Sequence, residues 1–112
     1  MLVKKAEEVP AEPVTTAGAE KTRLRLLLAE QDGAPNFRMR LIEVEEDGYS
    51  PYHSHDYEHE IFVLAGTGEL VGKDQHYPLQ AGNVVFVAAN EEHQFRNTGN
   101  QTLKFICLIP IK

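Results

Sequence analysis

The sequence predicts an all-β protein built as a sandwich, a jelly roll or a small barrel. From Arg23 onward, apolar and polar residues alternate with a period of two, which is typical of strands with one buried face. Glycine, asparagine and aspartate turns divide the chain into about eight short apolar segments. No segment carries the apolar stripe of a helix. Short strands at this spacing are typical of architectures that close a sheet or pair two sheets.

The first two predicted strands flank a turn. Residues 23–29 alternate leucines with polar or small residues, so the leucines are expected to share a buried face. The sequence DGAP at 32–35 is a turn signal, and residues 36–41 alternate again. A second turn cluster, EEDGYSP, occupies 45–51. The apolar faces of the two strands consist of Leu24, Leu26, Leu28, Phe37, Met39 and Leu41.

The remaining predicted strands are short and follow one another closely. They span 60–66, 68–72, 76–80, 84–88, 94–97 and 102–110. The runs IFVL and VVFV are apolar on both faces, so something must cover them on the outside as well as the inside. Because large exposed apolar patches are unusual on a monomer, the partner of a homodimer is the simplest cover.

Residues 1–20 are expected to form an N-terminal arm, and residues 21–112 a single barrel domain. The arm contains prolines and has no sustained periodicity, and 112 residues are close to the commonest size of one domain. Such an arm can pair with an edge strand of its own chain or of a neighbouring chain. The sequence leaves that choice open.

Charge and cysteine content exclude several classes of protein. The net charge of −6 repels phosphates and anionic membrane surfaces, so nucleic acid is not an expected partner. The chain has no apolar leader, and no apolar run approaches the roughly 18 residues of a membrane span, so neither export nor membrane insertion is expected. The single cysteine, Cys107, excludes an internal disulfide and favours the cytoplasm.

The stretch HSHDYEHE at 53–60 holds three of the five histidines. A solvated polar loop is the ordinary interpretation of such a stretch. In an extended segment, however, His53 and His55 share a face, and His59 joins them if the alternation continues. A bulge at 56–58 would bring Glu60 to that face instead. Converging imidazoles would suit a divalent transition metal.

A fourth candidate ligand, His93, lies in the stretch GNVVFVAANEEHQFRN at 82–97. A glycine turn, a buried strand and a short polar loop precede it. Alone, His93 would be an ordinary structural histidine. Beside the first stretch it supplies a ligand from a distant part of the chain, which favours a metal site over a polar loop.

The two stretches resemble the two motifs of the cupin superfamily. The first motif has a glycine, His-x-His, a Glu or His ligand a few residues later and another glycine. The second runs from a glycine through a proline and a glycine to a histidine and an asparagine. The matching residues are Gly48, His53, His55, His59 or Glu60, and Gly66 in the first motif, and Gly82, His93 and Asn97 in the second, with Ala88 and Asn90 where Pro and Gly are usual.

More narrowly, the segments HSHDYEHEIFVL, APNFRMRL and FICLIP resemble the corresponding segments of small single-domain cupins whose manganese is held by four histidines. The likeness implies a double-stranded β-helix barrel, jelly-roll-like, that encloses one divalent transition metal ion and forms a homodimer. Manganese is the ion it implies, and the donors also suit Fe, Ni, Cu or Zn. It assigns His53, His55, His59 and His93 as ligands and places Glu60 among the residues that support them.

Five apolar residues are candidates for a pocket near the metal. Alternation could turn them toward the barrel interior, although plain core packing is the ordinary role of each. They are Phe37, Met39, Phe95, Phe105 and Cys107. Cys107 is expected to behave as a small buried hydrophobe. Arg40, Tyr52 and Tyr57 could orient an anionic or carbonyl substrate near the metal, but surface exposure is the expectation for these three and for His76.

The predicted function follows from the open coordination sites. Four histidines leave two positions of an octahedral ion for water, dioxygen or another ligand. Together with the resemblance, this favours a mononuclear Mn or Fe enzyme with dioxygenase-type oxidative chemistry on a small organic substrate. The alternatives are a non-catalytic cupin that binds a metal or a small, sugar-like ligand, and a metal-dependent isomerase of sugar-derived acids. The sequence identifies neither a substrate nor a catalytic acid or base.

Overall fold

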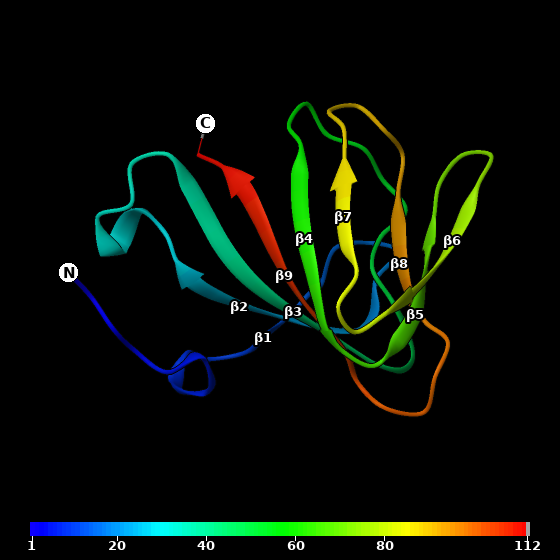
Figure 1. Cartoon of the computed structure of the whole chain (residues 1–112), viewed down its shortest axis with the longest axis horizontal. Coiled ribbons are helices and arrows are strands. Elements are labelled where there is room, and N and C mark those ends of the chain that lie inside the picture. Colours follow the sequence, from blue (N-terminus) through cyan, green and yellow to red (C-terminus); the bar gives the residue numbers. More distant parts are fainter. Residues whose placement is uncertain (112) are drawn as a thin grey trace.

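The computed structural model describes residues 1–111, which form one curled sheet of nine strands (Figure 1). The strands are β1 (Glu12–Pro13), β2 (Glu20–Leu28), β3 (Phe37–Tyr49), β4 (His59–Ala65), β5 (Thr67–Val71), β6 (His76–Gln80), β7 (Val84–Val87), β8 (Gln94–Asn97) and β9 (Leu103–Pro110). Two three-residue 3-10 helices, η1 (Ala6–Glu8) and η2 (Glu30–Asp32), complete the described elements. Neither has the length or the apolar character needed to cross a membrane. The predicted all-β class is confirmed, and β4 to β9 agree with the predicted strands to within one residue at each end.

The strand order places β6 and β7 at the two ends of the sheet. The order is β6-β5-β8-β3-β9-β4-β7, with β2 beside β3 and β1 beside β2. Within residues 1–111, β6 pairs only with β5, and β7 pairs only with β4. The sheet therefore curls into a barrel-like shape whose two end strands do not hydrogen-bond to each other.

Strand β3 turns its even-numbered residues toward the interior of the curled sheet. Arg40 lies opposite Cys107 of β9, and Cys107 is only 1% exposed. The expectation that Phe37 and Met39 face the interior is therefore wrong, because pairing with β9 sets the opposite phase. Phe37 is 62% exposed, and Met39 is half-buried on the outer side of the sheet.

A register shift in β2 changes which of its leucines is buried. The pairing with β3 is irregular between Leu26 and Leu28. As a result Leu27 is buried, whereas Leu24, Leu26 and Leu28 are only half-buried. The strand was correctly predicted, but its buried face was not, because a one-residue irregularity exchanges the two faces.

The turn predicted at 45–51 is an irregularity within the long strand β3. Its register against β2 shifts next to Glu20, and Asp47 adopts a left-handed backbone conformation with φ of 66°. Gly48 is buried in this segment, and a Cβ atom there would lie 2.8 Å from the carbonyl oxygen of Glu20. Only glycine lets the two strands approach this closely.

The N-terminal arm packs on its own chain. Strand β1 pairs with β2, and Arg25 donates from Nη1 to the carbonyl oxygen of Val9 at 2.6 Å. Lys4 Nζ lies 3.1 Å from a carboxylate oxygen of Asp32. The arm also borders a hollow that Met39 lines, which explains why Met39 is half-buried although it faces outward.

Strands β4 and β7 present apolar side chains to solvent. The two strands pair directly, and Phe62 lies opposite Val84 while Glu60 lies opposite Phe86. The exposed fractions are 48% for Phe62, 46% for Leu64, 74% for Val84 and 64% for Phe86. The two-sided apolar character of the runs IFVL and VVFV is thus confirmed.

Candidate metal centre

Backbone hydrogen bonds tie together two loops that are far apart in the sequence. The N–H of His53 donates to the carbonyl oxygen of His93 at 3.1 Å, and the N–H of His93 donates to that of His53 at 3.0 Å. The N–H of Asn90 donates to the carbonyl oxygen of His55 at 2.6 Å. Asn90 has a φ of 67°, a left-handed conformation that asparagine tolerates better than most residues. Asparagine can therefore stand where the second motif usually has glycine.

Strand β4 directs His59 into the same interior. His59, Ile61 and Val63 are buried, whereas Glu60 and Phe62 are exposed, as regular alternation requires. Glu60 was considered as an alternative ligand and as a residue that supports the ligands. The structure favours neither role, because the pleat points the Glu60 side chain to the outer face of the sheet.

Four imidazole rings converge at this place. The ligand atoms of His53, His55 and His93 lie within 4.8 Å of one another. His59 approaches with its Nε2 atom 2.5 Å from Nε2 of His55, and its ring centroid lies 5.0 Å from that of His93. The structure thus brings together all four histidines that the sequence predicts as ligands.

Hydrogen bonds to two of the rings leave one nitrogen of each available for a metal. His55 Nδ1 lies 2.9 Å from the carbonyl oxygen of Tyr57, and His93 Nδ1 lies 2.8 Å from that of Glu91. A carbonyl oxygen only accepts, so each neutral ring carries its proton on Nδ1 and keeps a lone pair on Nε2. Histidines that bind metals commonly donate their other N–H in this way. The donor set therefore fits a divalent transition metal ion.

His59 has different neighbours. Its Nδ1 atom lies 2.7 Å from Cys107 Sγ and 3.3 Å from Arg40 Nη2, and Arg40 Nη2 lies 3.0 Å from the same sulfur. The expected exposure of Arg40 is wrong, since its Nε atom is buried without a hydrogen-bond partner in the described chain. Cys107 is buried as expected, but its sulfur contacts two polar groups. Alternation with Ile42 and Val44, which lie on the same face of β3, was the signal that could have placed Arg40 inside.

The two tyrosines near the histidine cluster, Tyr52 and Tyr57, differ in how far they are exposed to solvent. The Tyr57 ring stacks on the His55 ring, with centroids 3.9 Å apart and an interplanar angle of 5°. Tyr57 is half-buried, so its expected surface exposure is wrong. Tyr52 and His76 are exposed, as predicted.

Three of the five predicted pocket residues face the interior. Phe95 and Phe105 are buried with their ring centroids 4.6 Å apart, and the Phe95 centroid lies 6.2 Å from that of His93. Cys107 is the third. These three side chains pack in the hydrophobic core next to the histidines. Other residues therefore line the open pocket.

Burial favours the neutral form of three histidines of the cluster, His53, His59 and His93. It lowers the pKa of His59 to about 2, and the positive charge of Arg40 is the next cause. Burial is also the main cause that lowers the pKa of His93 and that of His53. Neutral imidazole is the form that binds metals. Burial raises the pKa of the Cys107 thiol, and the nearby Arg40 opposes this rise.

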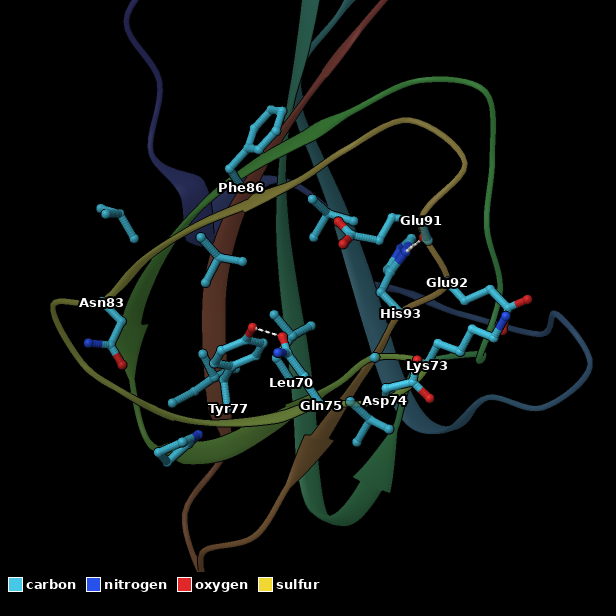
Figure 2. A pocket seen from close by; sticks show the side chains of 17 residues that line it. Leu70, Lys73, Asp74, Gln75, Tyr77, Asn83, Phe86, Glu91, Glu92 and His93 are labelled. Carbon is cyan, nitrogen blue, oxygen red and sulfur yellow. Dashed lines mark hydrogen bonds between the residues drawn. The ribbon is translucent and has the colours of Figure 1, made fainter.

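A hollow of about 620 Å³ opens between the end strands β6 and β7, and His93 is one of its lining residues (Figure 2). Its walls come from the β5–β6 hairpin, from β7 and from the loop before β8. Sequence reasoning missed this pocket, because no local pattern shows that the hairpin and β7 border one space. Its lining includes apolar Leu70, Pro78, Leu79, Val85 and Val87, the ring of Tyr77, and exposed Lys73, Asp74, Glu91 and Glu92.

Comparisons with known proteins agree with this architecture. Residues 40–109 match the cupin domain family. The whole chain (100%) superposes on 80% of the polyketide cyclase RemF from Streptomyces resistomycificus, with a TM-score of 0.94 and 34% identity. A predicted oxalate decarboxylase from Thermotoga maritima is matched over 99% of this chain and 100% of that chain, with a TM-score of 0.86 and 25% identity. The predicted double-stranded β-helix barrel is therefore confirmed.

A curated relative matches over a shorter segment. The oxalate-binding protein of Thermotoga maritima is 38% identical over 58 residues, which are 51% of this chain and 48% of that protein. The chain thus spans about half the length of this relative.

We expect the substitution His59→Ala to remove far more metal than Glu60→Ala. The first removes an inward imidazole, whereas the second removes a carboxylate on the outer face. Metal per chain, measured by mass spectrometry after dialysis of both variants against one free-metal buffer, checks this. The affinity of the His59 variant should fall by more than the roughly 10–100-fold typical of losing a ligand's supporting partner. Full metal occupancy in the His59 variant, or an empty Glu60 variant, would contradict the assignment.

We also expect the metal-free protein to lose stability as the pH falls below about 6.5. Unfolded imidazole binds a proton near pKa 6.5, whereas His59 has a folded pKa of about 2, so the unfolded state binds more protons in this window. The free energy of unfolding should fall by about 1.4 kcal/mol per pH unit for each such histidine. Urea unfolding with a chelator between about pH 7.5 and pH 5 measures the slope.

Two variants serve as controls for this pH dependence. His59→Gln should have a shallower slope, because its unfolded chain has one imidazole fewer to protonate. His76→Gln is the composition-matched control, because it also removes one imidazole but leaves the buried cluster intact. Equal slopes for the wild type and His59→Gln would disagree with a neutral, buried His59.

Proposed function

Since the chain belongs to the cupin domain family, which it matches over residues 40–109, we propose that it is a metal-dependent cupin that acts on a flat, carbonyl-rich organic molecule. The reaction class we propose is the cyclisation of a polyketide-like substrate. The observation that carries this proposal is the hollow beside His93, whose apolar walls and charged rim fit such a molecule better than a small anion. The whole-chain likeness to a polyketide cyclase supports it.

The metal in this proposal is held by His53, His55, His59 and His93. Manganese is the ion we propose first, and the four imidazoles also suit Fe, Ni, Cu or Zn. When bound, the ion would supply Lewis-acid polarisation of a carbonyl group, and a redox-active ion would add oxidative capacity. The protein's own contribution is to orient the His55 and His93 rings through the hydrogen bonds to the carbonyl oxygens of Tyr57 and Glu91.

The hollow selects for size and apolar character. A volume of about 620 Å³ lies within the range of roughly 300–1,000 Å³ that accommodates drug-sized ligands. Leu70, Val85 and Val87 provide apolar walls, and the half-exposed ring of Tyr77 provides a flat surface for stacking. The Tyr77 hydroxyl donates to Gln75 Oε1, which orients the ring at the hollow (Figure 2).

The charges around the hollow disfavour anions. Among its lining residues, Lys73 is the only cationic side chain, whereas Asp74, Glu91 and Glu92 are acidic. Oxalate or a sugar phosphate would have to pass the carboxylates of Asp74, Glu91 and Glu92 to reach the bound cation, and like charges repel. A neutral polyketone would meet no such repulsion. This difference favours the polyketide class over the oxalate class suggested by the other relatives.

Product analysis tests the proposed reaction. We expect the metal-loaded protein to convert an aromatic β-polyketone into a cyclised product that has lost water, because an enolate carbon attacks a ketone carbon and the ketone oxygen leaves as water. Mass spectrometry identifies the product, and an oxygen electrode follows dioxygen. Oxygen uptake with an oxygen-enriched product would support the dioxygenase-type chemistry predicted from the sequence. Binding without turnover would support a non-catalytic binding cupin.

A pocket variant makes the test specific to the hollow. Leu70→Asp places a charge on its apolar wall and should lower turnover at least tenfold with bound metal unchanged. Thr98→Asp, an exposed position outside the hollow, is the matched control and should retain turnover. Equal turnover in the two variants would place the substrate elsewhere.

We also propose that the chain forms a homodimer through the apolar outer face of β4, β7 and β9. Phe62, Phe86, Ile106 and Leu108 line one hollow on this face, and Phe62 and Phe86 are 48% and 64% exposed. A second copy would remove these side chains from water, which is the main driving force for association.

Sedimentation analysis of two variants tests the dimer. The wild type should sediment as a dimer at micromolar concentration, and Phe62→Glu should sediment as a folded monomer, because burying unpaired carboxylates in the interface is unfavourable. Thr98→Glu adds the same charge in the β8–β9 loop and should stay dimeric. A monomeric wild type would refute the proposal.

A further inference from the structure

The sulfur of Cys107 lies at the meeting point of three strands. Cys107 in β9 pairs with Arg40 of β3 on one side and with Ile61 of β4 on the other. Its sulfur lies 2.7 Å from His59 Nδ1 and 3.0 Å from Arg40 Nη2. The residue is 1% exposed, so solvent does not compete for these contacts.

Of the two polar groups near His59 Nδ1, only the sulfur is compatible with metal binding by that ring. A guanidinium only donates, so a hydrogen bond from Arg40 to Nδ1 would put the proton of the neutral ring on Nε2 and leave no lone pair there. A cysteine sulfur can accept a hydrogen bond. If Nδ1 donates to the sulfur, Nε2 keeps its lone pair and points toward the other histidines, as the contact with His55 Nε2 shows.

We infer that Cys107 is a positioning residue for the metal, an inference that rests on the proposed metal binding. Its sulfur accepts the Nδ1–H of His59 and holds the ring in the tautomer whose Nε2 binds the ion. It does for His59 what the backbone carbonyls of Tyr57 and Glu91 do for His55 and His93. Metal ligands of this kind depend on such partners for their orientation.

Arg40 shares this sulfur with His59. Its Nη2 atom donates to Cys107 Sγ at 3.0 Å, so the sulfur is placed to accept from the guanidinium as well as from the imidazole. The contact also engages the guanidinium inside the barrel, where no carboxylate forms an ion pair with it among the described residues. Cys107 therefore links a buried cation to a metal ligand without adding a carboxylate.

The competing explanation is that Cys107 only fills space in the core, as buried cysteines often do. Two substitutions separate the explanations, because they change volume and hydrogen bonding in opposite ways. Cys107→Val keeps an apolar side chain of similar size and removes the acceptor. Cys107→Ser keeps an acceptor and reduces the packing. A hydrogen-bonding role predicts that serine preserves metal affinity better than valine, whereas a packing role predicts the reverse.

The experiment measures the Zn²⁺ dissociation constant of the wild type and both variants by competition with a chelator. Circular dichroism and thermal unfolding of the metal-free proteins establish that each is folded. We expect the valine variant to bind Zn²⁺ about 10–100-fold more weakly than the wild type and the serine variant to lie much closer to the wild type. Wild-type affinity in the valine variant, or equal losses in both folded variants, would overturn the inference.

A spectroscopic measurement on the wild type keeps the test independent of how well the variants fold. Long-range ¹H–¹⁵N correlation spectra of the Zn²⁺-loaded protein report which nitrogen of His59 carries the proton. We expect a proton on Nδ1, and a proton on Nε2 would overturn the inference. A wild type that binds no Zn²⁺ would refute the metal site itself, whereas tight Zn²⁺ binding with unchanged affinity in the valine variant would refute only the role of Cys107.

Discussion

The reciprocal backbone hydrogen bonds between His53 and His93 are the constraint on which the candidate site depends. They join the loop after β3 to the start of β8, and the pairing continues from Ser50 to Phe95, whose backbone groups also bond at 2.9 Å. Without this connection the two motifs would be independent loops. With it, two histidines from separate motifs have fixed Cα positions on one wall of the barrel. His55 and His59 then need only the local geometry of an extended chain to face them.

The site combines four candidate ligand histidines with one half-buried cation, Arg40. Burial lowers the pKa of His53, His59 and His93, which favours the neutral form that binds metals. Arg40 is unfavourable beside a divalent cation, because like charges repel across a poorly solvated interior. The sulfur of Cys107 lies within 3.0 Å of both Arg40 Nη2 and His59 Nδ1, so it can accept a hydrogen bond from each. The chemistry of the site therefore depends on a second layer of side chains as much as on the histidines.

The opening between β6 and β7 connects the fold to the proposed function. A closed barrel would enclose the histidines within packed side chains such as Phe95 and Phe105. Because the two end strands do not pair, a hollow lined by both of them reaches His93. The charges at this hollow come from the β5–β6 hairpin and the loop before β8, which are exposed connections. Such connections can change without disturbing the barrel, so related cupins with the same histidines can select different substrates.

The sequence by itself determined the strands and the inward direction of the ligands. Period-two alternation predicted β4 to β9, and the odd-numbered series from His59 through Ile61 and Val63 correctly predicted that His59 faces the interior. These features are local, since alternation within one strand decides them.

Only the tertiary structure decided the features that depend on which strands meet. Within β3, Phe37, Met39 and Leu41 indicate one phase of alternation, whereas Ile42 and Val44 indicate the other. The pairing of β3 with β9 chose the second phase, so it turned Phe37 outward and Arg40 inward, against expectation. The same pairing brought Cys107 to Arg40, and the pairing of β9 with β4 brought Cys107 to His59. The hollow between β6 and β7 likewise exists only because the sheet curls until its two ends approach. Cross-strand register and sheet closure are long-range properties, and no period within a single segment encodes them.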